Sequence, residues 1–359
     1  MSTDAAHLEL ATDHAAPGML GFAERGRLPD TLIRAGIRRM CEARLRDELH
    51  GGLDVQAARM QSRIDALRES PVAIHTEEAN AQHYELPPAF FQQCLGARLK
   101  YSGCYYPTGR ETLDQAEEAM LTLYGQRAQL ADGQQILELG CGWGSLTLWM
   151  AERYPNARIT GVSNSHGQRA HIEAQCRARG LDNVRIITCD VNRLELDPAQ
   201  FDRCVSIEMF EHMRNYETLL GRVATWLKPG GALFVHIFCH RTQVYPFETA
   251  GDDNWMGRHF FTGGLMPAFD TLLHFQRDLA IESRWAVDGT HYEKTANHWL
   301  ANQDARREVV MPILREAYGE HAALWAQRWR MFWMSCAELF GHSNGQEWLV
   351  GHYLFRRHP

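Results

Sequence analysis

A short glycine-rich segment constrains the fold of this chain more than any other feature. The segment reads Glu138-Leu-Gly140-Cys-Gly142-Trp-Gly144; it follows a short strand expected at Gln135–Leu137 and precedes a helical pattern. Glycine is needed where a backbone passes close to a ligand or adopts a positive φ. The segment therefore predicts a strand, a tight loop and a helix, with the loop backbone close to a ligand. The alternative is that the glycines only make a tight turn.

Strand and helix patterns alternate after this loop. Strands are expected at 157–165, 183–190, 203–210 and 232–238, helices at 166–179 and 215–226, and a Leu-Lys-Pro-Gly-Gly turn at 227–231. The alternation predicts an α/β fold in which helices cover both faces of a parallel sheet. Two more strand-like segments, 279–287 and 347–355, are separated by a helical block at about 291–340.

The residues before the sheet are expected to form a helical cap. Apolar residues recur at helical spacing between Leu28 and about Ser70, and again over 112–124, whereas the first 18 residues show no periodicity. We expect a flexible tail at 1–18, a helical cap with a segment that covers a bound cofactor at 19–110, and a core at 111–359. The core carries a substrate-binding insertion at about 240–340.

Composition excludes several classes of protein. The 359 residues are 45% hydrophobic and 23% charged, as in a globular protein, and the net charge of -7 gives no overall attraction to nucleic acid or anionic lipid. Nine cysteines without a Cys-x-x-Cys pair favour a reducing compartment. With no leader peptide or long apolar stretch, we expect a cytoplasmic protein without stable membrane insertion; a homodimer is left open. Since the histidines show no metal-binding spacing, no metal is expected.

The glycine spacing argues against a dinucleotide. A dinucleotide loop usually reads Gly-x-Gly-x-x-Gly, but here the third glycine comes one position early and Ser145 stands in the last place. The Glu138 carboxylate would also repel a pyrophosphate, so a cationic or zwitterionic cofactor fits better.

The pattern resembles the first motif of class I S-adenosylmethionine-dependent methyltransferases. The resemblance implies a Rossmann-like, seven-stranded, mostly parallel sheet with a helical insertion before the last strand. It also implies S-adenosyl-L-methionine as cofactor and S-adenosyl-L-homocysteine as product. An acidic residue usual after the second strand is replaced here by Ser163-Asn164-Ser165 and Gln168, whose polar groups can make the same hydrogen bonds. The expected cofactor-binding residues are Tyr101, Ser102, Glu138, Gly140, Gly142, Gly144, Asn164, Gln168, Asp190 and Val191.

Further motifs narrow the resemblance. The Asn-Ser-x-x-Gln run, Tyr101-Ser102 and Phe210-Glu211-His212 are similar to the cyclopropane-fatty-acid synthases and their relatives. From about residue 20 to the C-terminus the chain also resembles the plant coclaurine N-methyltransferase group, which methylates tetrahydroisoquinoline amines. The segments that carry this likeness include LKYSGCYY, SIEMFEHMRNYE, DDNWMGRHFFTGG and AELFGHSNGQEWLV.

A bicarbonate site separates the two groups. In cyclopropane synthases the anion acts as a base, and Glu211, His236 and Tyr292 match residues of its site. Gly103 stands where a cysteine is expected, with Cys104 one position late, and Phe238 replaces an isoleucine. These departures favour an N-methyltransferase over cyclopropanation or methylation of an unsaturated acyl chain, which remains the alternative. A non-catalytic protein that only binds S-adenosylmethionine is a third reading.

Methyl transfer to an amine needs a neutral nitrogen and a group that takes its proton. Glu208, Glu211 and His212 follow the fourth expected strand, where an open α/β sheet binds its ligands. We expect His212 to take or relay the amine proton. Glu211 is expected to orient the His212 imidazole and to hold the cationic nitrogen, and Glu208 to support the acidic environment. The expected substrate is a small cationic amine, because aromatic faces attract cations. The expected substrate-binding residues are His236, Phe238, Trp255, His259, Phe260, Tyr292 and Trp333.

Overall fold

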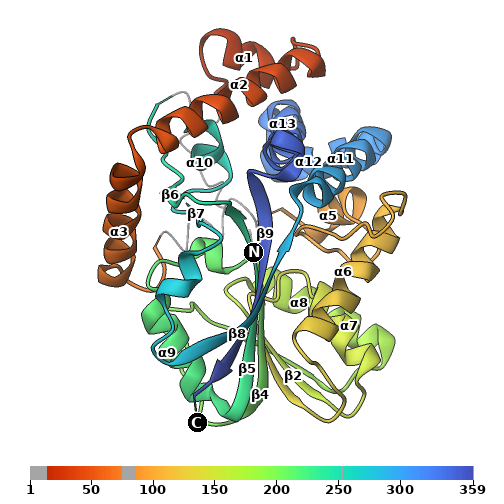
Figure 1. The fold of residues 1–359 in the computed structure, drawn as a ribbon. Helices are drawn as coiled ribbons and strands as arrows, with labels where there is room; N and C mark the ends of the chain where they lie inside the picture. Colours follow the sequence, from red (N-terminus) through yellow and green to blue (C-terminus); the bar gives the residue numbers. More distant parts are fainter. Residues whose placement is uncertain (1–13, 75–85, 252–253, 359) are drawn as a thin grey trace.

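A seven-stranded sheet lies at the centre of the computed structural model, which describes residues 14–74, 86–251 and 254–358 (Figure 1). Of the tail expected at 1–18, residues 1–13 lie outside the described part. The strands follow the order β3-β2-β1-β4-β5-β9-β8. Their bounds are β1 Gln135–Leu139, β2 Arg158–Ser163, β3 Val184–Thr188, β4 Phe201–Ile207, β5 Leu227–His240, β8 Leu279–Val287 and β9 Trp348–Arg357.

The strand order creates a ligand-binding edge. β1 pairs in parallel with both β2 and β4, so that Leu137 lies opposite Thr160 on one side and Cys204 on the other. Only β9 runs against its neighbours β5 and β8. From β1 the chain builds the sheet outward through β2 and β3 on one side, and then returns to add β4 and β5 on the other side of β1. Sheets of this kind bind ligands at the carboxyl ends of the strands where the strand order reverses, here between β1 and β4.

Helices cover both faces of the sheet, because alternate strand residues point to opposite sides. Phe234 of β5 packs with apolar residues of α6 and α7, whereas Val235 packs with residues of α3 and α9. The bounds of these helices and of the neighbouring α8 are α3 Leu53–Glu69, α6 Leu113–Arg127, α7 Ser145–Arg153, α8 His166–Arg179 and α9 Tyr216–Trp226.

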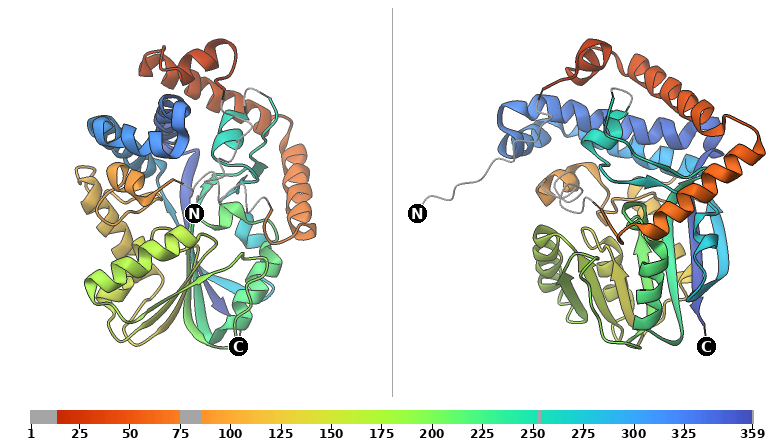
Figure 2. Two further views of the ribbon diagram at one scale, coloured as in Figure 1. Left: turned by 180° about the vertical axis from the view of Figure 1, so that it is seen from behind. Right: turned by 90° about the vertical axis from the view of Figure 1, so that its left-hand side faces the viewer.

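A second layer of helices lies across one end of the sheet (Figures 1 and 2). The expected block at 291–340 is three helices, separated at Arg306 and at a short turn that contains Gly319 with φ +56°. The long helix α13 packs against α11, α12 and the N-terminal α2. The layer comprises α1 Gly18–Glu24, α2 Asp30–Leu49, α5 Pro88–Cys94, α10 Trp255–His259, α11 Gly289–Ala305, α12 Arg307–Tyr318 and α13 Ala322–Gly341, beside a small hairpin of β6 Tyr245–Pro246 and β7 Leu265–Met266.

The structure confirms the predicted fold class and corrects two boundaries. The strand expected at 203–210 ends at Ile207, because Glu208 adopts a left-handed backbone with φ +47° and a 3-10 turn follows at Phe210–His212. The segment 227–231, expected to be a turn, begins β5: Leu227 pairs with Phe201 before a register shift, after which Ala232 pairs with Arg203. A bulge of this kind lets a glycine-containing segment stay in the sheet.

Candidate active site

The glycine-rich loop joins β1 to α7 at the ligand-binding edge. The amides of Gly140 and Cys141 both donate to the carbonyl of Val162 on β2, 3.0 Å away, which fixes the loop beside the neighbouring strand. A Cβ placed on Gly142 would meet no described atom within 4 Å, whereas one on Gly144 would lie 2.7 Å from Cγ1 of Ile172 on α8. Gly142 therefore leaves room beside the loop, and Gly144 serves the packing of two helices.

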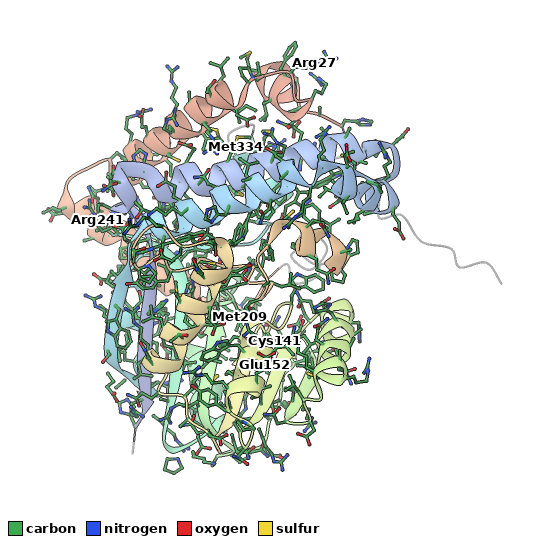
Figure 3. The ribbon with its side chains drawn as sticks, turned by 90° about the vertical axis from the view of Figure 1, so that its right-hand side faces the viewer. Arg27, Cys141, Glu152, Met209, Arg241 and Met334 are labelled. Atoms are coloured by element: carbon green, nitrogen blue, oxygen red, sulfur yellow. The ribbon has the colours of Figure 1, made fainter. Side chains whose placement is uncertain are left out.

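A cavity opens beside this loop. All of the expected cofactor residues except Gly144 line it, as do Glu208 and His212. Two of its lining residues, Cys141 of the loop and Met209 after β4, are labelled in Figure 3 at the end of the sheet that faces the helical layer. Sequence reasoning missed Lys100, Trp143, Met209 and Met213, which also line the cavity. Lys100 directly precedes Tyr101-Ser102, so the motif itself pointed to it.

Several polar atoms of the cavity lining have no hydrogen-bond partner among the described residues. They include Nε2 of Gln168, Oγ of Ser145 and Nε1 of Trp143, all buried. The other end of the Gln168 amide is fixed, because its Oε1 accepts from the Ser163 hydroxyl at 2.6 Å. A buried donor without a partner is costly, so these atoms fit a polar ligand that would bond to them.

Glu138, near the end of β1, is buried, and in the described part of the chain one side-chain donor lies beside it. Its carboxylate accepts from the Thr147 hydroxyl of α7. Burial raises the pKa of Glu138 to about 8, while the Thr147 hydrogen bond opposes that rise. A cation beside this carboxyl would favour its charged form.

The Glu208 carboxylate is held by three donors from separate segments. Its Oε1 accepts from the Gly103 amide and from Nε2 of His236, both at 2.9 Å, and its Oε2 accepts from the Tyr292 hydroxyl at 2.7 Å. Burial raises the pKa of Glu208, and the positive charge of Lys100 and the hydrogen bonds from Gly103 and Tyr292 counteract the rise. His236 and Tyr292, which match residues of the anion site in cyclopropane synthases, and Gly103, which stands in place of its cysteine, thus surround a carboxylate of the chain itself.

Lys100 lies behind this arrangement. Its ammonium donates to the Ser102 hydroxyl and to the Gly103 carbonyl at 2.6 Å, and it lies 5.1 Å from the centre of the Tyr124 ring. Burial lowers the pKa of Lys100, and the negative charge of Glu208 opposes that effect. The lysine therefore ties the Tyr101-Ser102 segment to the Glu208 site.

Glu211 and His212 have different environments. The His212 ring lines the cavity and stacks on Phe261, with ring centres 4.7 Å apart. Burial and the nearby Arg214 lower the pKa of His212 to about 4, so its imidazole is neutral at neutral pH. Glu211 lies outside the lining: its Oε1 accepts from the Phe238 amide at 2.7 Å, and its Oε2 has no hydrogen-bond partner among the described residues. Burial and then the charge of Glu208 raise the pKa of Glu211 well above its usual range.

The expected substrate residues are all described, and none of them lines this cavity. His236 and Tyr292 reach it indirectly, through Glu208. Phe260 stacks on Phe332 inside the helical layer, and the Trp333 indole donates to Gln303. Trp255 and His259 contact Glu24 of α1, and Phe238 packs against Phe340 of α13. Most of these side chains thus build the core of the helical layer.

In the three described ranges no group of three or more His, Cys, Asp or Glu side chains is placed to hold a metal ion. No helix of the described chain is long and apolar enough to span a membrane.

Comparison with known proteins places the chain among methyltransferases and their relatives. The mycolic acid cyclopropane synthetase family matches residues 73–348. An (S)-coclaurine N-methyltransferase of Thalictrum flavum subsp. glaucum is 37% identical over 344 residues, which cover 94% of this chain and 95% of the relative. The cyclopropane-fatty-acyl-phospholipid synthase of Escherichia coli K12 is 29% identical over 272 residues, or 75% of this chain and 66% of the relative.

A solved structure agrees with the fold. The crystal structure of a coclaurine N-methyltransferase bound to N-methylheliamine and S-adenosylhomocysteine matches with a TM-score of 0.90 and 38% identity, covering 94% of this chain and 98% of that one. A mycolic acid cyclopropane synthase, also solved with S-adenosylhomocysteine, matches with a TM-score of 0.68 at 21% identity and shows the fold alone.

Proposed function

Since the chain belongs to the mycolic acid cyclopropane synthetase family and is an S-adenosylmethionine-dependent methyltransferase, we propose that it methylates the nitrogen of a small isoquinoline-type amine. The observation that carries the proposal is the position of the Glu208 carboxylate: it follows β4 and lines the same cavity as the glycine-rich loop. A proton acceptor thus lies in the cavity that holds the methyl donor.

The cavity lining has groups suited to the cofactor. The Gly140 and Gly142 backbone, Glu138, Asn164, Gln168 and Asp190 would hold S-adenosylmethionine, with Tyr101, Ser102 and Val191 completing the site. The unpartnered donor of Gln168 fits a ligand hydroxyl or carboxylate, and Glu138 fits a ligand ammonium group. When bound, the cofactor supplies the sulfonium methyl group that a nitrogen lone pair can attack.

Glu208 is the proton acceptor of this proposal. An aliphatic amine is mostly protonated at neutral pH, so its lone pair becomes available only when a base removes the proton. During the transfer a nitrogen–carbon bond forms and the sulfur–carbon bond breaks, and the amine proton passes to the Glu208 carboxylate. His212, neutral and stacked on Phe261, presents an imidazole to the same cavity. Glu211 lies behind the cavity and supports the turn through the Phe238 amide.

The alternative function is modification of an acyl chain. In the cyclopropane synthases that the sequence resembles, a bound anion acts as the base for that reaction. Here the donors that would hold such an anion, the Gly103 amide, His236 and Tyr292, contact the Glu208 carboxylate instead. This arrangement favours the amine, since a fixed carboxylate replaces a diffusible base.

A labelled-methyl assay tests the proposal. The protein is incubated with methyl-labelled S-adenosylmethionine and, in parallel, with tetrahydroisoquinoline, aryl-alkyl and polyamine acceptors and with unsaturated phospholipid vesicles plus bicarbonate. We expect label in an N-methylated isoquinoline and a loss of about a hundredfold or more in Glu208→Gln. Glu282→Gln, on the outer strand β8, is the control and should retain activity. Label found only in lipid would overturn the proposal.

A further inference from the structure

A row of hydrogen bonds leads from Glu208 through the sheet to an arginine on the other side. Nε2 of His236 lies 2.9 Å from Oε1 of Glu208, and Nδ1 of His236 lies 2.9 Å from Nε2 of His352. Nδ1 of His352 lies 2.7 Å from Nη1 of Arg127. His236 and His352 are directly opposite each other on β5 and β9, and Arg127 is the last residue of α6, so three rigid elements hold the row in place.

Arginine determines the direction of every bond in this row. A guanidinium has only N–H donors, so Nδ1 of His352 must accept and carries no proton. His352 then carries its proton on Nε2 and donates to Nδ1 of His236. His236 in turn carries its proton on Nε2 and donates to Glu208. Both rings are therefore neutral and both donate toward the cavity.

The surroundings of the two rings agree with this assignment. Both imidazoles are fully buried, and burial together with the positive charges of Lys100 and Arg127 lowers both pKa values well below the usual range. The Tyr124 hydroxyl lies 2.9 Å from the same Nδ1 of His236, so it shares the single lone pair of this nitrogen with the His352 donor. Arg127 itself stacks on Trp285, 4.9 Å from the ring centre, and is half-buried.

We propose, building on the proposed function, that Arg127 and His352 are positioning residues that fix the His236 ring as a donor to Glu208 and so keep this carboxylate ionised to accept the amine proton. The row is closed to proton exit, because Arg127 cannot accept a proton from His352. A proton taken by Glu208 therefore leaves through the cavity and not through the sheet.

Other groups also act on Glu208, and the Arg127 and His352 variants below leave them in place. The titratable groups that face it from the packed elements are Lys100, Cys104, Tyr124, Glu211, His212, His236, Tyr292 and Cys336. Of these, Lys100 and the two hydrogen-bond donors His236 and Tyr292 favour the charged carboxylate, while Glu211 disfavours it when ionised.

The first experiment reads the protons directly. Histidine ¹⁵N spectra of the intact protein at pH 7, assigned with His236→Gln and His352→Gln, should show both rings neutral and protonated on Nε2. In Arg127→Met the His352 ring should lose this preference. A wild-type His352 ring protonated on Nδ1, or spectra unchanged by Arg127→Met, would overturn the inference whether or not the protein methylates an amine.

The second experiment reads the carboxylate. Without Arg127 or His352 the His236 ring is no longer fixed as a donor, which disfavours the ionised form of Glu208 and raises its pKa. The acidic limb of kcat/KM against pH should therefore move up by about one pH unit in Arg127→Met and in His352→Leu. Arg127→Lys and His352→Gln keep a donor in each place and should restore most of the wild-type profile. The matched control is Arg153→Met, which removes an arginine that stacks on Trp149 at 5.2 Å and is exposed.

The outcomes separate this inference from the proposed function. Carbon-13 titration of the Glu208 carboxyl in wild type and Arg127→Met measures the same rise without any turnover. If the titration shifts but no amine is methylated, the proposed function fails and the hydrogen-bond row stands. If amines are methylated and the profiles of Arg127→Met, His352→Leu and Arg153→Met coincide with wild type, the row has no influence on Glu208 and the inference is wrong.

Discussion

Glu208 combines a strained backbone with a carboxylate that accepts three hydrogen bonds. A non-glycine residue at φ +47° is uncommon, and holding a residue in a sparsely populated region costs about 1–3 kcal/mol. Its amide nevertheless donates to the His236 carbonyl at 2.9 Å, so the strained conformation is fixed at both its backbone and its carboxylate. Because the left-handed turn ends β4, it directs the carboxylate into the cavity.

The turn three residues later sets the direction of the Glu211 side chain. The 3-10 turn at Phe210–His212 directs its carboxylate toward the Phe238 amide and places the His212 ring in the cavity. The two glutamates therefore act in different places, although both are buried and both have raised pKa values.

At the scale of elements, Glu138 joins β1 to α7 and gives a pH-dependent prediction. Its folded pKa of about 8 lies above the ordinary value of 4.5, so its contribution to stability is complete below pH 4.5 and is lost as the pH rises toward 8. The loss approaches about 1.4 kcal/mol per pH unit. We expect Glu138→Gln to be more stable than wild type at pH 8, with the advantage shrinking toward pH 5, but to bind S-adenosylmethionine more weakly.

Thermal unfolding at pH 5, 6.5 and 8 measures this difference, and calorimetric titration measures cofactor binding. The exposed Glu195→Gln should follow wild type at each pH. An advantage of Glu138→Gln that is independent of pH would show that the carboxyl is not held protonated.

The elements themselves were largely predictable from sequence. Alternating patterns located the strands and most helices of the core, because each element buries one apolar face. The end of β4 was predicted three residues too late, since Ser-Ile-Glu-Met-Phe has an ordinary strand composition and the left-handed turn at Glu208 depends on tertiary contacts. The start of β5 was missed because Pro229 and Gly230 favour a turn; they lie in the irregular segment between Leu227 and Ala232, both of which pair with β4.

The residues expected to bind the cofactor gather around one cavity, whereas those expected to bind the substrate do not line it. Loop and strand-end residues are set by local sequence, and nearly all of them line the cavity. Aromatic residues such as Phe260 and Trp333 carry no local mark of their role, because a buried core and a ligand wall use the same side chains. The His236–His352 contact joins strands 116 residues apart and could not be read from spacing.

At the scale of the whole molecule, a buried ion pair joins the N-terminal helix α1 to the long helix α13. The Glu24 carboxylate accepts from Nε of Arg328 at 3.0 Å, from the Trp255 indole at 2.9 Å and from the Ala16 amide at 2.6 Å. Both charged side chains are fully buried, so each depends on the other for compensation.

Removing one partner of this pair should be costly. We expect Glu24→Ala to lower the free energy of unfolding by about 3–5 kcal/mol, because the Arg328 charge would remain buried without its carboxylate. Glu173→Ala breaks the exposed pair with Arg169 and should change stability by less than about 1 kcal/mol. Chemical denaturation of both variants checks the difference; equal losses would contradict a stabilising role of the buried pair.

The central claim, that the Glu208 carboxylate accepts the amine proton, is tested most directly by formate rescue of Glu208→Gly. Glycine adopts φ +47° without strain and leaves the Gly103 amide, His236 and Tyr292 facing the space of the lost carboxylate. We predict that N-methylation falls by about a hundredfold or more and that added formate restores part of it. In Glu208→Leu, whose side chain fills that space, formate should restore nothing. Glu208→Gly with wild-type turnover in the absence of formate would contradict the account.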